Sequence, residues 1–132
     1  MLNPQRRALM SYRLQSAAEK LQSAKLLLDN GQYKDSIGRS YYAMFSAIRA
    51  LLAVDGVDFK KHSGVISYFQ REYIKSKTFD VKYSKYITSA FQIRNNADYA
   101  DFFLVSVHDA QQQYSHAKEL YDIIQNYLQQ LK

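Results

Sequence analysis

The sequence predicts an all-α protein, an up-and-down antiparallel bundle of about five helices, three of them long and two shorter. Apolar residues recur at spacings of three and four over most of the chain, as one face of a helix requires. Only four glycines and one proline occur in 132 residues, so few positions can interrupt a helix. No stretch alternates apolar and polar residues as a half-buried strand would.

The first predicted helix has Asn3 as its N-cap and Pro4 at its first position. We expect it to end at Gly31, because glycine is the common residue just after a helix. Its inward stripe consists of Met10, Leu14, Ala17, Leu21, Ala24 and Leu28. The second predicted helix stops before Asp55-Gly56. Its inner face consists of Ile37, Tyr41, Met44, Ile48 and Leu51.

A third, shorter helix is predicted from about Ser63, its expected cap, to Ile74. The fourth follows Asp80, which we also expect to act as a cap, and it ends in the polar turn Arg94-Asn95-Asn96-Ala97-Asp98-Tyr99. Its inner positions are Tyr83, Ile87, Ala90 and Phe91.

The fifth helix opens at Ser106 with Asp109 three residues later, the pattern of a capping box. It has the most regular stripe, formed by Ala110, Tyr114, Ala117, Tyr121, Ile124, Leu128 and Leu131. Because no repeat, low-complexity segment or linker interrupts the chain, we expect residues 1–132 to form one domain.

The composition excludes several kinds of site. The absence of cysteine excludes disulfides, thiolate metal sites and a cysteine nucleophile. No glycine-rich phosphate loop and no His/Asp/Glu cluster with metal-ligand spacing is present, so we predict no metal and no cofactor. The chain begins without the apolar core of a signal peptide and lacks a run of about 20 apolar residues. We therefore expect a soluble, cytoplasmic protein with no membrane partner.

The net charge of +6 is unevenly distributed. Residues 60–85 hold seven basic and two acidic residues, whereas residues 98–132 are net negative. A basic sector of this density can attract phosphate groups or an acidic partner. It can equally be a solvated lysine-rich surface that keeps the protein soluble.

Arg94 does not fit the inner face of the fourth helix, where Ile87 and Ala90 would be followed by another apolar residue. One interpretation places it in the last turn, paired with Asp98 or Asp101. The other has it point into a cleft and bind phosphate through its forked donors.

The second helix carries two further polar features. Asp35 and Arg39 lie one turn apart, and we expect a helical ion pair there rather than a site. In the pair Tyr41-Tyr42 one ring should point inward, while the other faces a neighbouring helix or protomer.

Three segments of the chain resemble the HEPN domain, in a consistent order over nearly its whole length. They read GQYKDSIGRSYYAMF from Gly31, KHSGVI from Lys61 and RNNADY from Arg94. The resemblance is strongest to the stand-alone prokaryotic branch, often encoded beside a minimal nucleotidyltransferase. It implies a helical bundle, usually dimeric, in which the motif turns of two protomers share a cleft.

Active members of this family look like metal-independent RNases, with an Arg, a polar residue and then a His after four to six intervening residues. Arg94 and Asn95 match the first two places, but Tyr99 stands where the His would be. Imidazole titrates near 6.5, whereas a phenol with a pKa near 10 is ionised in about one molecule in a thousand at pH 7. We therefore expect weak or absent RNase activity, with Arg94 and Tyr99 as the candidate catalytic pair.

Two histidines could supply the missing base. His108 lies near the start of the fifth helix, which returns beside the end of the fourth, and His62 matches a recurrent family position. Each could equally be an exposed or capping histidine, and His116 should lie on the surface. The candidate residues for nucleotide or RNA binding are Arg94, Asn95, Asp98 and His62.

Three functional hypotheses remain open. The first is a nucleotide- or RNA-binding regulatory protein that partners a minimal nucleotidyltransferase in a toxin–antitoxin-like module, with Tyr99 as a nucleotide acceptor. The second is an active endoribonuclease toxin that uses His108 or His62. The third is a non-catalytic helical oligomerisation protein. The resemblance also implies a homodimer.

Overall fold

The computed structural model describes residues 2–101 and 103–131, and within these ranges the chain contains helices and no β-strand. Three long helices are α1 (Pro4–Asp29), α2 (Tyr33–Asp55) and α5 (Val107–Gln129). The others are α4 (Lys82–Tyr99) and the short α3 (His62–Phe69), which continues into the π-helix η1 (Gln70–Ile74). The all-α prediction is confirmed.

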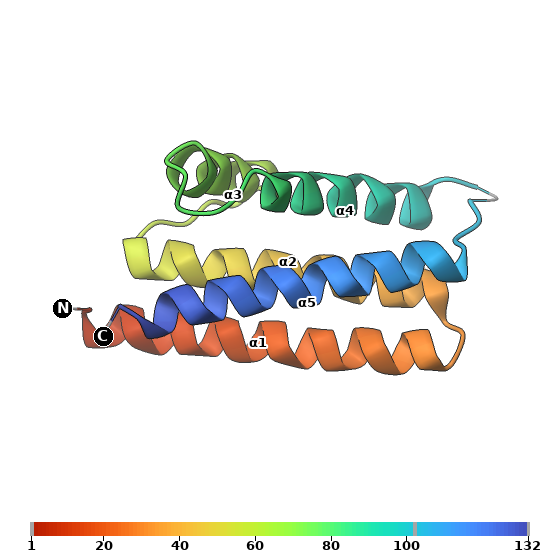
Figure 1. Ribbon diagram of the computed structural model, residues 1–132, viewed down its shortest axis with the longest axis horizontal. Coiled ribbons are helices and arrows are strands. Elements are labelled where there is room, and N and C mark those ends of the chain that lie inside the picture. The colour runs from red at the N-terminus through yellow and green to blue at the C-terminus, as the bar shows by residue number, and fades with distance from the viewer. Residues whose placement is uncertain (1, 102, 132) are drawn as a thin grey trace.

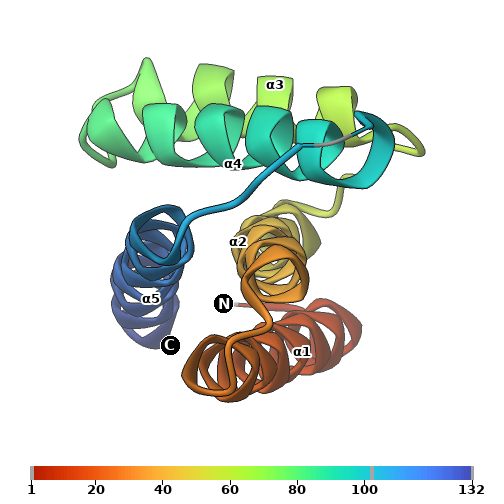
Figure 2. The same cartoon turned by 90° about the vertical axis from the view of Figure 1, so that its right-hand side faces the viewer.

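The helices form three levels when the molecule is viewed from the side. Figure 1 shows α1 at the bottom, α2 and α5 in the middle, and α3 with α4 at the top. Helices α1, α2, α4 and α5 alternate in direction along the chain, as expected for an up-and-down bundle. Figure 2, seen along α2 and α5, shows α3 and α4 lying across them as a separate layer.

Helix α2 is the central element, because it contacts α1, α3, α4 and α5. Its buried face is wider than that of the other helices and includes Tyr41, Met44, Ile48 and Leu51. The core continues into α5 through Leu120 and Ile124, while Tyr114 and Tyr121 pack against it partly exposed. Small residues such as Ala43 and Ala47 let the neighbouring helices approach α2 closely.

Two helix starts agree with their sequence signals. The Asn3 side chain accepts hydrogen bonds from the backbone N–H groups of Gln5 and Arg6. Ser106 and Asp109 form a reciprocal capping box at the start of α5. These bonds satisfy backbone donors that have no partner inside the helix.

Two other starts differ from the prediction. Helix α3 begins at His62 after Lys61, and Ser63 lies inside it rather than capping it. The Asp80 carboxylate does accept from the backbone N–H of Lys82 at 2.9 Å, but the residue just before α4 is Val81. The His62 start matters for the site, because it orients the imidazole toward α2.

The predicted turn at residues 94–99 is wrong, since α4 continues through Tyr99. The segment contains no glycine or proline, and Ala97 is buried at a position that continues the inner face. Arg94 and Asp98 lie one helical turn apart and form an ion pair, which stabilises the helix along this stretch. Arg94 is therefore held on a rigid helix and not on a loop.

The π-helix η1 is held in place by the carboxylate that ends α2. Asp55 accepts hydrogen bonds from the hydroxyls of Tyr68 at 2.9 Å and Tyr73 at 2.7 Å. Tyr73 is buried, and burial together with the neighbouring carboxylate raises its pKa well above the usual range. The phenol thus stays protonated and ties η1 to the end of α2.

Candidate functional site

Arg94 lies near the end of α4 with only 17 % of its side chain exposed. One terminal nitrogen donates to the hydroxyl of Tyr42 at 2.9 Å, and the other to the side-chain oxygen of Asn95 at 3.3 Å. Its Nε lies 3.0 Å from an Asp98 carboxylate oxygen, as an ion pair without hydrogen-bond alignment. The predicted pairing with Asp98 is confirmed, and the side chain also points inward onto α2; binding of phosphate stays a prediction.

The guanidinium also lies over aromatic rings of α2. Its central carbon is 5.2 Å from the ring centre of Tyr42 and 5.7 Å from that of Tyr41. A cation over an aromatic face is attracted to it, most strongly where water is excluded. The expectation for the tyrosine pair is confirmed, because Tyr41 is buried while Tyr42 faces α4.

His62 reaches the same two tyrosines from the start of α3. Its Nδ1 lies 2.7 Å from the Tyr41 hydroxyl, and its ring stacks on Phe45 with centres 4.1 Å apart. Burial, and then the positive charges of Arg94 and Arg49, lower the pKa of His62 below 6.5. We call Arg94, Tyr41, Tyr42 and His62 the Arg94 cluster.

Tyr41, which lies between Arg94 and His62, cannot itself serve as a base. Burial raises the pKa of Tyr41 far above its ordinary value, and Tyr42 adds to this effect. A neutral phenol can donate to His62 Nδ1 or accept from it, depending on which imidazole nitrogen carries the proton. The second ring nitrogen of His62 has no hydrogen-bond partner among the residues that the structure describes.

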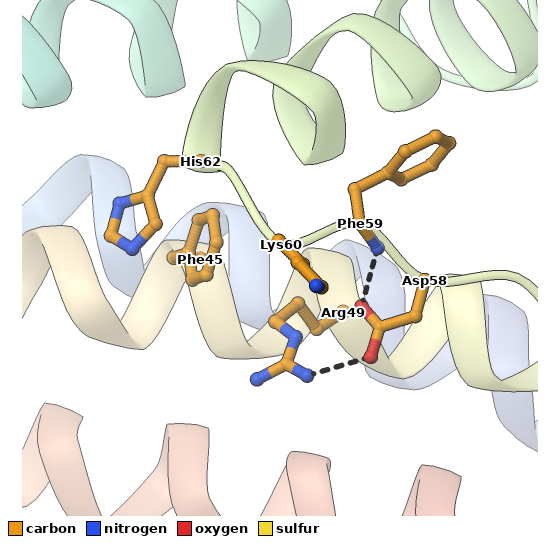
Figure 3. A pocket seen from close by; sticks show the side chains of 6 residues that line it. All are labelled: Phe45, Arg49, Asp58, Phe59, Lys60 and His62. Carbon is orange, nitrogen blue, oxygen red and sulfur yellow. Dashed lines mark hydrogen bonds and ion pairs between the residues drawn. The ribbon is translucent and has the colours of Figure 1, made fainter.

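A hollow of about 420 Å³ lies beside His62, between α2 and the loop that leads to α3. Arg49 and Lys60 are among the residues that line it, and Figure 3 shows Asp58 close to Arg49. Arg49 donates to Asp58 at 3.0 Å, and Arg13 of α1 donates to the same carboxylate oxygen at 3.0 Å. Burial opposes ionisation of Asp58, but the backbone N–H of Phe59 and then Arg49 and Arg13 hold its pKa below the ordinary value. The lining has two cations, Arg49 and Lys60, and one anion, Asp58, so its net charge is positive.

A second hollow of about 520 Å³ lies on the other side of Tyr42, near the start of α2. Its charged residues are Lys34, Arg39, Asp35 and Asp98. The ion pair that the sequence suggested between Asp35 and Arg39 is not among those formed in the described part of the chain. Arg39 instead extends toward solvent on an exposed position of α2.

The remaining predicted residues lie apart from the Arg94 cluster. Tyr99 is the last residue of α4 and 76 % exposed, with no ring contact or hydrogen bond to the cluster in the described structure. His108 is exposed in the first turn of α5, and no hydrogen bond or ion pair with Arg94 occurs within residues 2–101 and 103–131. His116 is not a surface residue as predicted, because it is partly buried and its ring stacks on Tyr86 at 3.8 Å.

Sequence reasoning missed Arg13 and Arg49, whereas Lys60 belongs to the basic sector of residues 60–85 that the sequence singled out. Arg13 is buried and donates to the backbone oxygen of Arg49 at 2.9 Å, where the apolar stripe of α1 gave no sign of a charge. A signal for Arg49 did exist, since it follows Arg39, Tyr42 and Ser46 at spacings of three and four on α2.

The described residues contain neither a metal-binding group of side chains nor a membrane-spanning helix. No group of three or more His, Asp or Glu side chains that could hold a metal ion occurs among the described residues. Within those same residues no helix combines the length and apolarity needed to cross a membrane.

Comparison with known proteins identifies relatives of the whole fold. The family model described as HEPN domain matches residues 10–127. A "UPF0332 protein" of Thermotoga maritima is 32 % identical over 124 residues, covering 94 % of each chain. "Putative toxin MJ0605" of Methanocaldococcus jannaschii is 34 % identical over 99 residues, 75 % of this chain and 74 % of that protein.

A third relative is "UPF0332 protein PH1297" of Pyrococcus horikoshii, 50 % identical over 70 residues. That match covers 53 % of this chain and about half, 49 %, of the Pyrococcus protein. The family model spans the helices that carry Arg94, His62 and the two tyrosines, and the segments that resembled the family all lie within its limits. The chain belongs to the HEPN domain family.

Proposed function

We propose that this protein is a HEPN-type regulatory protein that binds RNA or nucleotide phosphate through Arg94, within a toxin–antitoxin-like module. Relatives named as putative toxins in Methanocaldococcus jannaschii support the class of module. A minimal nucleotidyltransferase is the partner that the resemblance suggests. Tyr99, exposed at the end of α4, is the side chain that such an enzyme could modify.

The observation that carries the proposal is the placement of the Arg94 guanidinium. It is fixed by the Tyr42 hydroxyl and stacked over two rings, so little conformational freedom remains to be lost on binding. Its other partner, the Asp98 carboxylate, is 42 % exposed and can give way to a phosphate oxygen. The Arg94 guanidinium is thus already in position, and a phosphate can replace the half-exposed Asp98 carboxylate as its partner.

The same geometry supports weak or absent cleavage. Cutting RNA without a metal needs a base for the 2′-hydroxyl and a cation for the phosphorane. Tyr99 has no contact with Arg94 among the described residues, so it is poorly placed to act beside it. We therefore assign Tyr99 no role as a base.

An active endoribonuclease that uses His62 is the second candidate. It is favoured by one observation, the shared contact of His62 and Arg94 with Tyr41, which brings imidazole and guanidinium to one place. The lowered pKa of His62 keeps the ring neutral at pH 7, as a base requires. Its Nδ1 already faces Tyr41, so only the other nitrogen could accept a proton from RNA.

The test is binding and cleavage of a labelled single-stranded RNA by the purified protein in EDTA, followed by fluorescence anisotropy and gel electrophoresis. We expect salt-dependent binding without cleavage, and Arg94→Ala should weaken binding about 10- to 100-fold because a charge-assisted contact is lost. Lys75→Ala is the matched control, since Lys75 is exposed in the basic sector and makes no hydrogen bond or ion pair to the cluster among the described residues.

Each other result has a defined meaning. Cleavage that both Arg94→Ala and His62→Gln abolish would establish the endoribonuclease instead. Equal loss in Lys75→Ala and Arg94→Ala would show a diffuse surface charge and contradict a site at Arg94. Failure of the wild-type protein to bind RNA or nucleotide at low salt would leave the oligomerisation protein.

A homodimer is part of this proposal. Three side chains near the end of α4 and the start of α5 are exposed although apolar or aromatic, namely Tyr99, Leu104 and Val107. Exposed apolar side chains gathered at one end of a helix pair favour an interface. A second chain placed there would lie close to the Asp98 side of the Arg94 cluster.

A further inference from the structure

Two hollows meet at the loop that joins α2 to α3. One is the hollow of about 420 Å³ beside His62, and the other, of about 270 Å³, lies between the start of α1 and the end of α2. Asp58 lines both, so they are neighbouring parts of one concave surface. The second hollow is lined by Gln5, Arg6, Leu9, Arg13, Ala53, Gly56, Val57 and Asp58. We call the lining of both hollows the Asp58 surface.

Asp58 is anchored to two helices. Arg13 of α1 and Arg49 of α2 each donate to its Oδ2 at 3.0 Å, and the backbone N–H of Phe59 donates to its Oδ1 at 2.8 Å. Arg13 is only 8 % exposed, and its other terminal nitrogen donates to the backbone oxygen of Arg49. A buried guanidinium with both terminal nitrogens bonded holds the loop against the helices. A partner that binds here would therefore meet a surface that is already ordered, which lowers the entropic cost of binding.

The Asp58 surface has more positive than negative charge. Among the described residues that line it, Asp58 is the one anion, and the cations are Arg6, Arg13, Arg49 and Lys60. The Asp58 carboxylate is already shared by two arginines, whereas Lys60 has no ion pair within the described part of the chain. Arg6 also lines a further hollow together with Asp55 and Glu72, which offsets part of its charge. The surplus of positive charge is therefore clearest at Lys60 and Arg49.

Apolar side chains lie exposed among these charges. Leu9 is 42 % exposed in the hollow at the start of α1, outside the inward stripe of that helix. Phe59 is 41 % exposed in the hollow beside His62, and Figure 3 shows it next to Lys60 on the loop. Val57 and Ala53 line the same hollow as Leu9. Exposed apolar side chains with a polar rim are typical of a site for another protein.

The aliphatic part of this lining favours a protein segment over a nucleic acid strand. Nucleic acid binds to cations and to flat ring faces, and it gains little from Leu9, Val57 or Ala53. A small ligand is enclosed by a single cavity, whereas two hollows that meet at Asp58 suit a chain that spans both. Carboxylates on that chain would complement the charge of Lys60 and Arg49.

We propose that the Asp58 surface binds a protein segment that carries acidic and apolar side chains. Apolar side chains of the segment enter the hollows at Leu9 and Phe59, while its carboxylates face Lys60 and Arg49. The buried apolar side chains supply most of the affinity, and the charges give specificity and a fast association. This inference goes beyond the proposed function, because it assigns a surface to a protein partner and does not involve Arg94.

The probe is a displayed library of random peptides, selected for binding to the purified protein. We expect the selected peptides to be enriched in Asp and Glu together with Leu and Phe. A labelled copy of the strongest peptide is then measured by fluorescence anisotropy. Lys60→Glu and Leu9→Ser should each weaken its binding about tenfold. The effect of Lys60→Glu should shrink in high salt, whereas that of Leu9→Ser should persist, because salt screens only the charge.

Two controls match these variants. Lys75→Glu and Leu26→Ser make the same chemical changes at exposed positions that line neither hollow, so both should bind the peptide as the wild type does. The melting temperature of each variant shows that it is folded. A peptide whose acids are replaced by lysine should bind Lys60→Glu more tightly than it binds the wild type, because the charge complementarity is then restored.

The remaining outcomes separate this inference from the proposed function. Selection of no binding peptide, or of peptides without enrichment in acids, would overturn the inference. Equal affinity of the strongest peptide for the wild type, Lys60→Glu and Leu9→Ser would overturn it as well. It would also be wrong if the two variants lost binding of RNA but not of the peptide, since the surface would then serve nucleic acid. Arg94→Ala should leave peptide binding unchanged, so a wild type that binds the peptide but no RNA refutes the proposed function alone.

Discussion

The imidazole of His62 is tuned by three neighbours that come from different parts of the chain. Tyr41 bonds its Nδ1, Phe45 stacks on its ring, and Arg94 adds positive charge nearby. Burial among these side chains and the positive charges of Arg94 and Arg49 act against protonation, because burial and like charge both disfavour the imidazolium. The pKa of His62 is thus a direct reporter of the Arg94 cluster.

Arg94→Gln should raise the pKa of His62 toward its ordinary value, because the variant removes one of the positive charges that lower it. The measurement is an NMR titration of the His62 ring in the wild type and the variant. Arg71→Gln is the control, since Arg71 is exposed and pairs with Glu72 away from the cluster. An unchanged pKa in Arg94→Gln would show that the two side chains are not electrostatically coupled.

Stability should depend on pH through His62 and His116. Burial lowers the pKa of both in the folded state, so below about pH 6.5 the unfolded chain binds more protons. The free energy of unfolding should therefore be fully developed above pH 6.5 and fall as the pH drops below it. Urea denaturation between pH 5 and pH 7.5 checks this, and His62→Gln should make the fall smaller.

Single residues were also where the sequence was least informative. It singled out Arg94 and His62, but the partners that position them lie 52 and 21 residues away, at Tyr42 and Tyr41. Such contacts depend on which way α2 faces, and spacing within one helix does not reveal this. Arg13 was missed for the same reason, because its burial is made possible by Asp58 and a backbone oxygen of another helix.

The helices themselves were largely predictable. Five helical segments follow from the spacing of apolar residues, and the caps at Asn3 and Ser106 were read correctly. The error at residues 94–99 arose because Asn and Asp favour turns in isolation, whereas burial of Ala97 and the Arg94–Asp98 pair continue the helix. Nothing in the spacing indicated the π-helical turn η1, which depends on bonds to Asp55.

Tyr73→Phe should lower the free energy of unfolding by about 1.5–3 kcal/mol, because a buried hydrogen bond to a charged group is lost. The remaining bond from Tyr68 favours the lower end of this range. Thermal denaturation followed by circular dichroism measures the change. Tyr12→Phe, at an exposed position of α1, should leave the melting temperature as it is. A wild-type melting curve for Tyr73→Phe would show that Asp55 does not hold η1.

The molecule as a whole presents its exposed apolar side chains at the end where α4 and α5 meet. If the proposed homodimer uses this end, Leu104→Glu should convert it to a monomer, because Leu104 is 89 % exposed and a carboxylate would be costly to bury. Analytical ultracentrifugation measures the change, with Leu26→Glu on α1 as a control of similar chemistry. A monomeric wild type would refute the homodimer.

The covering of α2 by four other helices has a consequence for how the protein can diverge. Substitutions at its packed positions, such as Ala43 or Ile48, lower the stability of the fold, so their effect on activity gives no information about a ligand. At exposed or half-exposed positions of α2, such as Arg39 and Ser46, a side chain can change with little loss of folding energy. In a saturation mutagenesis screen for activity, loss of activity after substitution of Arg39, Ser46 or Arg49 would show that these side chains are needed for function. Retained activity after most substitutions there would show that they are not.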